Sequence, residues 1–218
     1  MNRRILLLFL LFVTLQAEER KQVPLPTSKL LTAPVPGYVG ALNGFPVTAA
    51  LSPDHRYAAF LNDGYGAQAN GGHQSIAILD LTTNQIADFP DSRLPEDAHQ
   101  SYFIGLAFSR DGAHLYASIG SITDPEGKRP GNTGNGIAVY SFRDGKVTPE
   151  RFLKLKRQKI GQGKRIAAAL KKGSSKAIPY PAGIAVIPPA RPNNPELLLV
   201  ANNLSDNVVL LDSNSGRV

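Results

Sequence analysis

The sequence of 218 residues contains no cysteine and no tryptophan. The absence of cysteine excludes a disulfide framework, a thiolate metal site and a thiol nucleophile. A long apolar run is also missing, since no segment reaches the roughly 20 apolar residues that a membrane-spanning helix needs. The composition, 42% hydrophobic and 19% charged, is nevertheless too apolar for a disordered chain. We therefore expect a folded chain, and its 20 glycines and 17 prolines predict many turns.

The N-terminus has the pattern of a secretory signal peptide. Arg3 and Arg4 precede nine apolar residues, 5–13, and Ala17 supplies the small residue of a cleavage site. The alternative is a buried strand or helix. The pattern predicts that residues 1–17 are a Sec-type signal, that the protein is exported to the periplasm or the extracellular space, and that the mature chain has no integral membrane span.

The most informative pattern is a threefold repeat of short apolar segments. Residues 75–80, 136–141 and 207–212 align without a gap, and a turn containing Asn, Asp, Ser or Gly follows each of them. The segments before them form a second aligned set, at residues 57–62, 114–119 and 197–202. A third set is expected to form the innermost strands, at residues 47–51, 104–108 and 182–187. Four short strands per repeat in a fixed order are typical of a β-propeller blade, so we predict an all-β fold.

One stretch of the third repeat resembles a known family. Residues 198–218 read LLVANNLSDNVVLLDSNSGRV, which resembles the YVTN-type repeat of secreted bacterial β-propellers of the YncE-like family. Repeats one and two are similar to it more loosely, through the Ser-Pro-Asp at 52–54 and the Ser-Arg-Asp-Gly at 109–112. The resemblance implies WD40-like four-stranded blades in a ring of seven. Some members of that family carry a C-terminal alkaline-phosphatase-like phosphoesterase domain, and this chain is similar to that subgroup.

These patterns predict the domain organisation. Residues 18–42 are expected to be an N-terminal extension, which would serve as a ring-closing strand or as a plain linker. Residues 43–218 would be a partial propeller whose blades span about 45–89, 102–153 and 180–218. Three blades do not close a ring, and Val218 is where the fourth strand of the third repeat would begin. We expect the chain to be the N-terminal part of a longer protein; the alternatives are a compact truncated sheet domain and a self-assembling partial ring.

The long connections are predicted to lie on one face. Because blade strands alternate in direction, residues 63–73, 90–101, 120–135 and 149–179 should emerge together, opposite the proline-rich loop 188–196. Insertions in a repeat array often mark the binding face. We therefore predict that this face binds a protein, a carbohydrate or a polyanion, although loops also vary freely where nothing packs on them.

Six residues are candidate ligand contacts on that face. The aromatic ones could stack on a ligand at the mouth of a central channel, or seal the packing between blades. The polar ones could bind a cation or a sugar, or simply form tight turns. The six candidates are Phe45, Tyr102, Tyr180, Asn202, Asn203 and Asp206.

Positive charge is concentrated in a basic insert at residues 150–179. Ten Lys and Arg and no acidic residue lie between positions 151 and 176, and residues 164–172 have a helical composition. Such a segment could attract a polyanion. The alternative is a solvated loop resting against an acidic partner domain, or against the acidic stretch of Asp88, Asp91, Glu96 and Asp97. The candidate polyanion ligands are Lys156, Arg157, Lys159, Lys164, Arg165, Lys171 and Lys172.

Catalytic and metal motifs are not recognisable. The four histidines lack the spacing of a zinc helix, residues 161–165 lack the complete phosphate-binding loop, and residues 212–216 lack the closing Glu of a calcium loop. We predict no catalytic residue, no metal and no cofactor. The predicted function is an exported, non-catalytic propeller module that binds a ligand or partner. The alternative is the propeller half of a secreted phosphoesterase whose catalytic domain is covalently linked beyond Val218.

Overall fold

The computed structural model describes residues 22–24, 30–32, 37–64, 73–94, 99–159, 176–189, 191 and 194–218. The predicted signal peptide and the predicted helical part of the insert lie outside these residues. The chain divides into two compact units, residues 1–39 and 40–218. In the first unit, β1 (Gln22–Pro24) pairs antiparallel with β2 (Leu30–Thr32).

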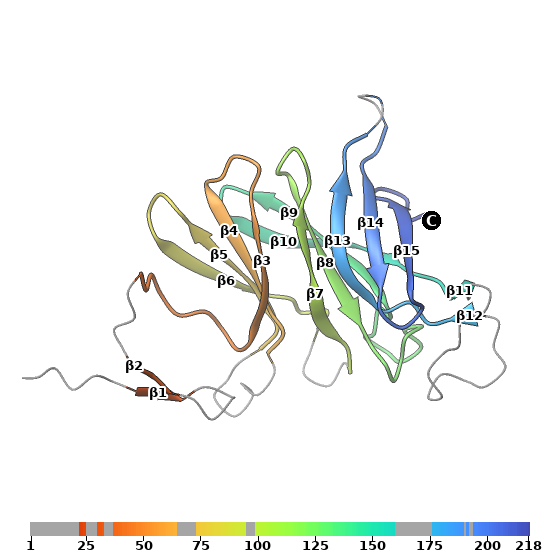
Figure 1. The fold of residues 1–218 in the computed structure, drawn as a ribbon, viewed down its shortest axis with the longest axis horizontal. Helices are drawn as coiled ribbons and strands as arrows, with labels where there is room; N and C mark the ends of the chain where they lie inside the picture. Colours follow the sequence, from red (N-terminus) through yellow and green to blue (C-terminus); the bar gives the residue numbers. More distant parts are fainter. Residues whose placement is uncertain are drawn as a thin grey trace, which may run out of the picture. The chain divides into compact units, whose positions relative to one another are not determined.

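The second unit is all-β, and its described residues contain no helix (Figure 1). Each sheet is an antiparallel meander, in which every strand pairs with the next one along the chain. Sheet 1 contains β3 (Pro46–Leu51), β4 (Tyr57–Asn62), β5 (Ser75–Asp80) and β6 (Gln85–Pro90). Sheet 2 contains β7 (Ser101–Phe108), β8 (His114–Gly120), β9 (Gly136–Arg143) and β10 (Lys146–Lys154). Sheet 3 contains β13 (Pro181–Ile187), β14 (Leu197–Asn202) and β15 (Asn207–Asp212), and β11 (Gln158–Lys159) pairs with β12 (Lys176–Ala177) in a separate short hairpin.

The sequence-predicted strands agree with these bounds. The second and third strands of all three repeats begin at the predicted residues, and the first strands overlap theirs. Sheets 1 and 2 have four strands each, whereas sheet 3 has three strands within the described residues. The prediction of an all-β chain built from four-stranded antiparallel repeats is therefore confirmed for the first two repeats.

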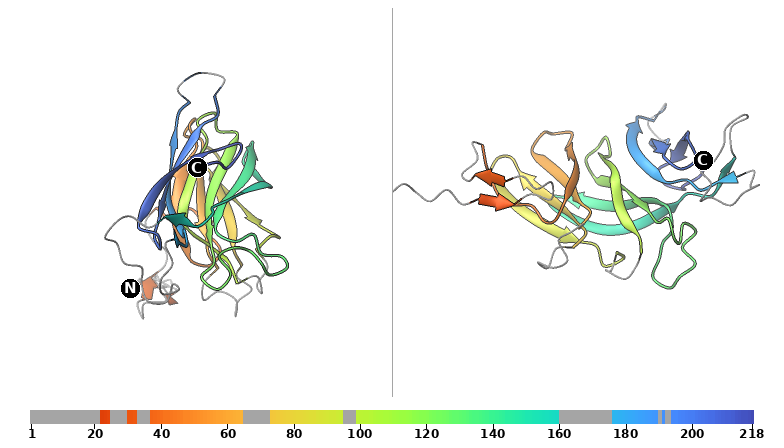
Figure 2. Two further views of the ribbon diagram at one scale, coloured as in Figure 1. Left: turned by 90° about the vertical axis from the view of Figure 1, so that its right-hand side faces the viewer. Right: turned by 60° about the horizontal axis from the view of Figure 1, so that its bottom comes forward.

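The three sheets are stacked so that their first strands lie side by side. β7 lies between β3 and β13, as the views in Figures 1 and 2 both show. Contacts between the fourth strands β6 and β10 are sparse, so sheets 1 and 2 diverge from their first strands outwards. Each of the three first strands also has a register shift near its beginning. Such β-bulges increase the local twist of a strand, which helps successive sheets to rotate relative to one another.

The first turn of each four-stranded sheet is built in the same way. In sheet 1 the Ser52 hydroxyl donates to Asp54 Oδ1 at 2.5 Å and accepts the N–H of Tyr57 at 2.9 Å. In sheet 2, Ser109 donates to Asp111 Oδ1 at 2.6 Å and accepts the first N–H of β8 at 2.8 Å. Short polar side chains that bond their own backbone fix a turn without help from tertiary contacts. The sequence repeat thus corresponds to a repeated hydrogen-bond pattern.

The turns before the fourth strands differ more than the gap-free alignment suggests. Asp80 closes the β5–β6 turn by accepting the N–H of Thr82 at 2.8 Å, and Asp212 makes the same kind of bond in sheet 3. In sheet 2, Asp144 and Gly145 have φ values of 49° and 79° and form a two-residue hairpin. Two successive residues with positive φ permit this tight turn, so β9 and β10 continue pairing closer to it than β5 and β6 do.

The three sheets pack together through two hydrophobic cores. Between sheets 1 and 2 the core is partly aromatic, because the Phe142 ring packs edge-on against Tyr57 and Phe108 at centroid distances of 5.2 and 5.0 Å. Between sheets 2 and 3 it is mainly aliphatic. Its buried members are Tyr116, Ile137, Val139, Leu153, Leu155, Leu198, Val200, Val209 and Leu211. The alternation of buried and exposed residues along β14 and β15 follows from burial of this one face.

The opposite face of sheet 3 is apolar and exposed. Leu199, Val208 and Leu210 are 39%, 58% and 43% exposed. The aligned side chains of sheet 2, Ile137 and Val139, are fully buried because sheet 3 packs on them. Aligned positions therefore differ in burial because of the neighbouring sheet and not because of their strand.

A buried polar network accompanies the first core. The Asp91 side chain is fully buried and forms an ion pair with Arg93 at 2.7 Å, while the Tyr140 hydroxyl donates to it at 2.6 Å. The Tyr140 and Tyr102 hydroxyls lie 2.6 Å apart. Burial opposes ionisation of Asp91, but the bonds from Arg93 and Tyr140 outweigh it and keep the Asp91 pKa below its usual value. Burial, together with the nearby Asp91 charge, raises the pKa of Tyr102.

Candidate functional site

The two ends of the sheets form two different faces. At the first, called the turn face, lie the short turns that join first to second strands, with the β13–β14 loop; they are at the top of Figure 1. At the second, called the loop face, lie loop 121–135 and the β11–β12 hairpin, towards the lower right of Figure 1. This division follows from the antiparallel order of the strands. The sequence-predicted interaction face corresponds to the loop face.

Loop 121–135 on the loop face is organised around Asp124. This carboxylate is 5% exposed and accepts the backbone N–H groups of Lys128 and Arg129 at 2.9 Å each, and the Asn132 amide at 2.7 Å. The two N–H groups are the main reason that the pKa of Asp124 falls to about 2. At the base of the loop, Asn135 donates to the Pro179 carbonyl oxygen at 2.5 Å. The loop is therefore a fixed structure that joins sheet 2 to the entry of sheet 3.

A basic pocket of about 380 Å³ lies beside this loop. Its walls carry four cationic side chains and a single carboxylate, Glu126, and are completed by Pro125, Leu155, Ile178 and Pro179. The four cations are Lys154, Lys156, Arg157 and Lys176. Glu126 is already bonded by Arg157 Nε at 2.6 Å and by Lys128 at 2.8 Å, which lowers its pKa to about 2. Cationic side chains therefore outnumber acidic ones in the lining of the pocket.

The β11–β12 hairpin adds to this charge. Lys159 and Lys176 stand directly opposite each other in its two-residue ladder. Like charges at opposed positions of an antiparallel pair repel each other, and an anion lying near both lysines would offset this repulsion. We call this pocket, together with Lys159, the hairpin pocket.

The structure brings part of the predicted polyanion set together. Lys156 and Arg157 line the hairpin pocket, and Lys159 lies in β11. The other four predicted residues, Lys164, Arg165, Lys171 and Lys172, lie outside the described residues. Lys154 and Lys176 were not in the predicted set, although both belong to the same run of basic residues in the sequence.

The acidic stretch at residues 88–97, an expected alternative partner of the basic insert, makes other contacts where the structure describes it. Asp91 is enclosed with Arg93, as described above. Asp88 accepts the Ser75 hydroxyl at 2.6 Å and lies 3.1 Å from His73 Nε2. Glu96 and Asp97 lie outside the described residues. Within the part of the chain that the structure describes, no ion pair joins this stretch to the basic insert.

The three predicted aromatic residues differ in environment. Phe45 is 43% exposed, has a φ of 55° and precedes β3. Tyr102 is 1% exposed and lies in the core between sheets 1 and 2, which fits the alternative role of sealing the packing between sheets. Tyr180 is partly buried, with its ring edge-on to Phe103 at a centroid distance of 5.1 Å, and burial raises its pKa.

The three predicted polar residues lie at the β14–β15 turn. Asn202 is 3% exposed and donates to Asn207 Oδ1 at 3.2 Å, while its own Oδ1 is buried without a hydrogen-bond partner among the described residues. The backbone N–H of Asn203 donates to the Tyr180 carbonyl oxygen at 2.9 Å. Asp206 has a φ of 46°, as a tight turn requires. Their contacts are therefore largely those of a turn.

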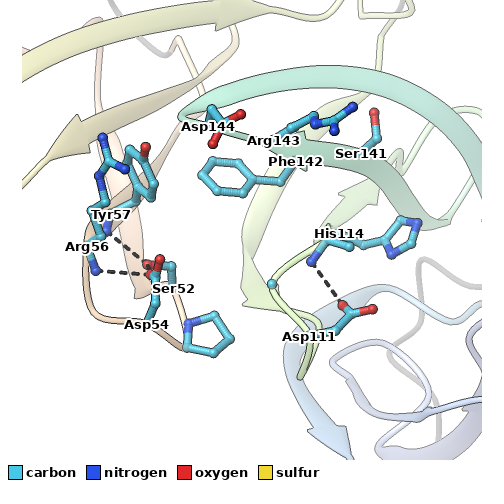
Figure 3. A pocket seen from close by; sticks show the side chains of 13 residues that line it. Ser52, Asp54, Arg56, Tyr57, Asp111, His114, Ser141, Phe142, Arg143 and Asp144 are labelled. Carbon is cyan, nitrogen blue, oxygen red and sulfur yellow. Dashed lines mark hydrogen bonds between the residues drawn. The ribbon is translucent and has the colours of Figure 1, made fainter.

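A groove that was not predicted from the sequence lies on the turn face. This groove, called groove A, has a volume of about 920 Å³ and lies between sheets 1 and 2. Figure 3 shows Asp54 and Asp111, from the two Ser-x-Asp turns, together with Asp144 from the β9–β10 hairpin. Its cations are Arg56, which pairs with Asp80 at 3.1 Å, and Arg143. The repeated Ser-x-Asp pattern is the sequence signal for this groove, although the pattern by itself indicates only a turn.

Groove A contains serine, aspartate and histidine but not the geometry of a hydrolase triad. The Ser52 hydroxyl donates to Asp54 and accepts a backbone N–H, so it is occupied by the turn. His114 Nε2 lies 3.3 Å from a carboxylate oxygen of Glu150. A triad of this kind needs a histidine within hydrogen-bond distance of the serine hydroxyl, and none of these contacts supplies one. The groove can recognise a ligand through charge and shape.

Other classes of site are not found among the described residues. They contain no group of three or more His, Asp or Glu side chains that could hold a metal ion. No helix among them is long and apolar enough to cross a membrane. Comparison with known proteins also gives no assignment, since no protein-family model and no curated protein sequence matches this chain.

Proposed function

We propose that this protein is an exported, non-catalytic binding module of the β-propeller type, related to the YVTN-repeat family, and that its loop face binds a polyanion. The side-by-side first strands, the divergence of sheets 1 and 2 and the repeated Ser-x-Asp turns support the propeller architecture. The resemblance of residues 198–218 supports the family. The N-terminal basic and apolar pattern supports export.

The observation that carries the polyanion proposal is the hairpin pocket. Lys154, Lys156, Arg157 and Lys176 surround one hollow, and the carboxylate among them is already paired. Cationic side chains spaced along a ribbon bind a repeating anion through charge rather than through sequence or stereochemistry. Loop 121–135 provides the rigid wall against which the ligand would lie. Nucleic acid, anionic cell-wall polymer and anionic lipid headgroups share this chemistry.

Affinity for an immobilised sulfated polymer tests the proposal. The double variant Lys156→Gln/Lys159→Gln should elute from heparin at a clearly lower salt concentration than the unchanged protein, because each lost contact reduces the salt dependence of binding. The matched control is Arg143→Gln/Lys146→Gln, which removes two charges from the turn face. Equal retention of all three proteins, or equal loss in both variants, would show that the loop face is not the binding face.

A further inference from the structure

A second groove on the turn face lies between sheets 2 and 3. This groove, called groove B, has a volume of about 640 Å³, within the range of small-molecule sites. One wall is the β7–β8 turn, the other is formed by the described residues 189, 191 and 194–196 between β13 and β14, and Tyr116 of β8 and Arg151 of β10 complete it. It is the counterpart of groove A one repeat further along the chain.

The two carboxylates of groove B accept hydrogen bonds from other residues of the protein. Asp111 accepts the Ser109 hydroxyl at 2.6 Å and the Ala113 N–H at 2.9 Å. Glu196 reaches across the groove, where Oε1 accepts the backbone N–H of Arg110 at 2.8 Å. These two acids therefore hold the turn and the two walls together through uncharged donors, and neither pairs with a guanidinium group.

Two of the three arginines that line groove B have guanidinium groups without a partner among the described residues. Those of Arg110 and Arg191 stand on opposite walls and form no hydrogen bond or ion pair with any residue of the described chain. Arg151 donates to the Ser213 carbonyl oxygen at 3.0 Å and contacts Glu150, but its Nε is buried and has no partner among the described residues.

The two grooves differ in charge although they occupy equivalent positions. Groove A is lined by three carboxylates and two guanidiniums, and one of those guanidiniums is neutralised by Asp80. Groove B is lined by three arginines and two carboxylates, together with Asn194 and Asn214, and one of its arginines, Arg151, is paired with Glu150. The difference arises mainly from Arg110 and Arg191, whose guanidinium groups have no acidic partner among the described residues.

We propose that groove B is a binding site for a small anionic sugar, a hexose-sized ligand that carries a carboxylate or a phosphate. Guanidinium groups bind both kinds of oxyanion through paired N–H donors. Arg110 and Arg191 hold the oxyanion from opposite walls, and Arg151 approaches it from β10. The amides of Asn194 and Asn214 supply donors and acceptors for the hydroxyl groups. The site is separate from the hairpin pocket, which lies on the loop face.

Calorimetric titration of the full exported chain at low ionic strength tests this site. The probes are glucuronate, glucose 6-phosphate and uncharged glucose. We expect saturable binding of at least one of the two anions and none of glucose; comparison of the two anions identifies the oxyanion. The double variant Arg110→Gln/Arg191→Gln should weaken binding by about tenfold or more, because it removes two charge-assisted contacts.

Two controls separate this site from its alternatives. Arg143→Gln, in groove A, and Lys156→Gln/Lys159→Gln, in the hairpin pocket, should leave the affinity for the small anion unchanged. Circular dichroism of each variant establishes that it is folded. Absence of saturable binding, equal binding of glucose, or equal weakening by Arg143→Gln would overturn the proposal. Loss in the lysine variant alone would assign the anion to the hairpin pocket instead of groove B.

Discussion

The two interfaces between sheets use the same strand positions but different chemistry. Sheets 1 and 2 meet through aromatic rings and through the buried network of Asp91, Arg93 and Tyr140. Sheets 2 and 3 meet through aliphatic side chains and through a close backbone approach at Gly105 of β7. A side-chain Cβ at Gly105 would overlap the Ala182 carbonyl oxygen of β13.

The comparison shows two ways to fix the position of a sheet. The first interface is specified by directional contacts, since Arg93 also donates to the Arg151 carbonyl oxygen at 3.3 Å and so attaches the β6–β7 connection to β10. The second is specified by shape, because the absence of a side chain lets β7 and β13 approach. Substitutions should therefore disturb the two interfaces by different mechanisms.

The largest effect on the free energy of unfolding is expected from Asp91→Ala in the first interface. The substitution leaves the mostly buried Arg93 without its counter-charge and the Tyr140 hydroxyl without an acceptor, so the free energy of unfolding should fall by about 3 kcal/mol. Urea denaturation measures it. Tyr140→Phe, which removes one hydroxyl and leaves the ion pair, should cost clearly less. Equal losses would mean that the ion pair does not specify the interface.

Gly105→Ala tests the second interface and should cost about 1–3 kcal/mol, because β7 and β13 must move apart. The matched control is Gly183→Ala in β13, where a new Cβ would meet only the Ala201 side chain at 4.0 Å. That variant should have nearly unchanged stability. A similar thermal midpoint for the two variants would contradict specification by shape.

The smallest effect on stability is expected when the pH is lowered, and it arises in loop 121–135. This loop joins the two interfaces. Ser121 donates to the His99 carbonyl oxygen at 2.6 Å, on the connection between sheets 1 and 2, while Asn135 contacts Pro179 beside sheet 3. The Asp124 pKa of about 2 lies below its ordinary 3.8, so its contribution to stability is present above about pH 4 and is lost as the pH falls towards 2.

Asp124→Asn should therefore lower the thermal midpoint at pH 7, and the difference from the unchanged protein should shrink as the pH approaches 2. Thermal unfolding followed by circular dichroism at several pH values measures this. A difference that stays constant over that range would show that the charge of Asp124 does not hold the loop.

Much of the fold was predictable from local patterns. Strands such as β4, β5 and β15 have the predicted bounds, because alternation, apolar composition and turn residues act over a few positions. The Ser-x-Asp turns were also visible, since their hydrogen bonds join residues two and five positions apart. Interactions between residues that are close in the chain can therefore be predicted from short sequence patterns.

The candidate sites were less predictable because they depend on distant residues. Tyr102 was expected near a channel mouth, but its hydroxyl meets that of Tyr140, 38 positions away, in the core. Groove B joins Arg110 to Arg191 across two sheets, and no sequence pattern relates them. The basic insert was easier to recognise, since Lys154, Lys156 and Arg157 are near neighbours in the chain.

The meander order of the sheets has a consequence for folding kinetics. Every strand of the described sheets pairs with a neighbour in sequence, so no strand pairing within a sheet has to wait for another strand to fold between its partners, and most of the pairings close a short loop of chain. Closing a short loop costs less entropy than closing a long one, and proteins with local contacts cross lower folding barriers than those with distant pairings. The sheets should therefore form one after another from independent hairpins, and the slow step should be their docking. Stopped-flow refolding of Gly105→Ala would then show a normal early phase and a slowed late one.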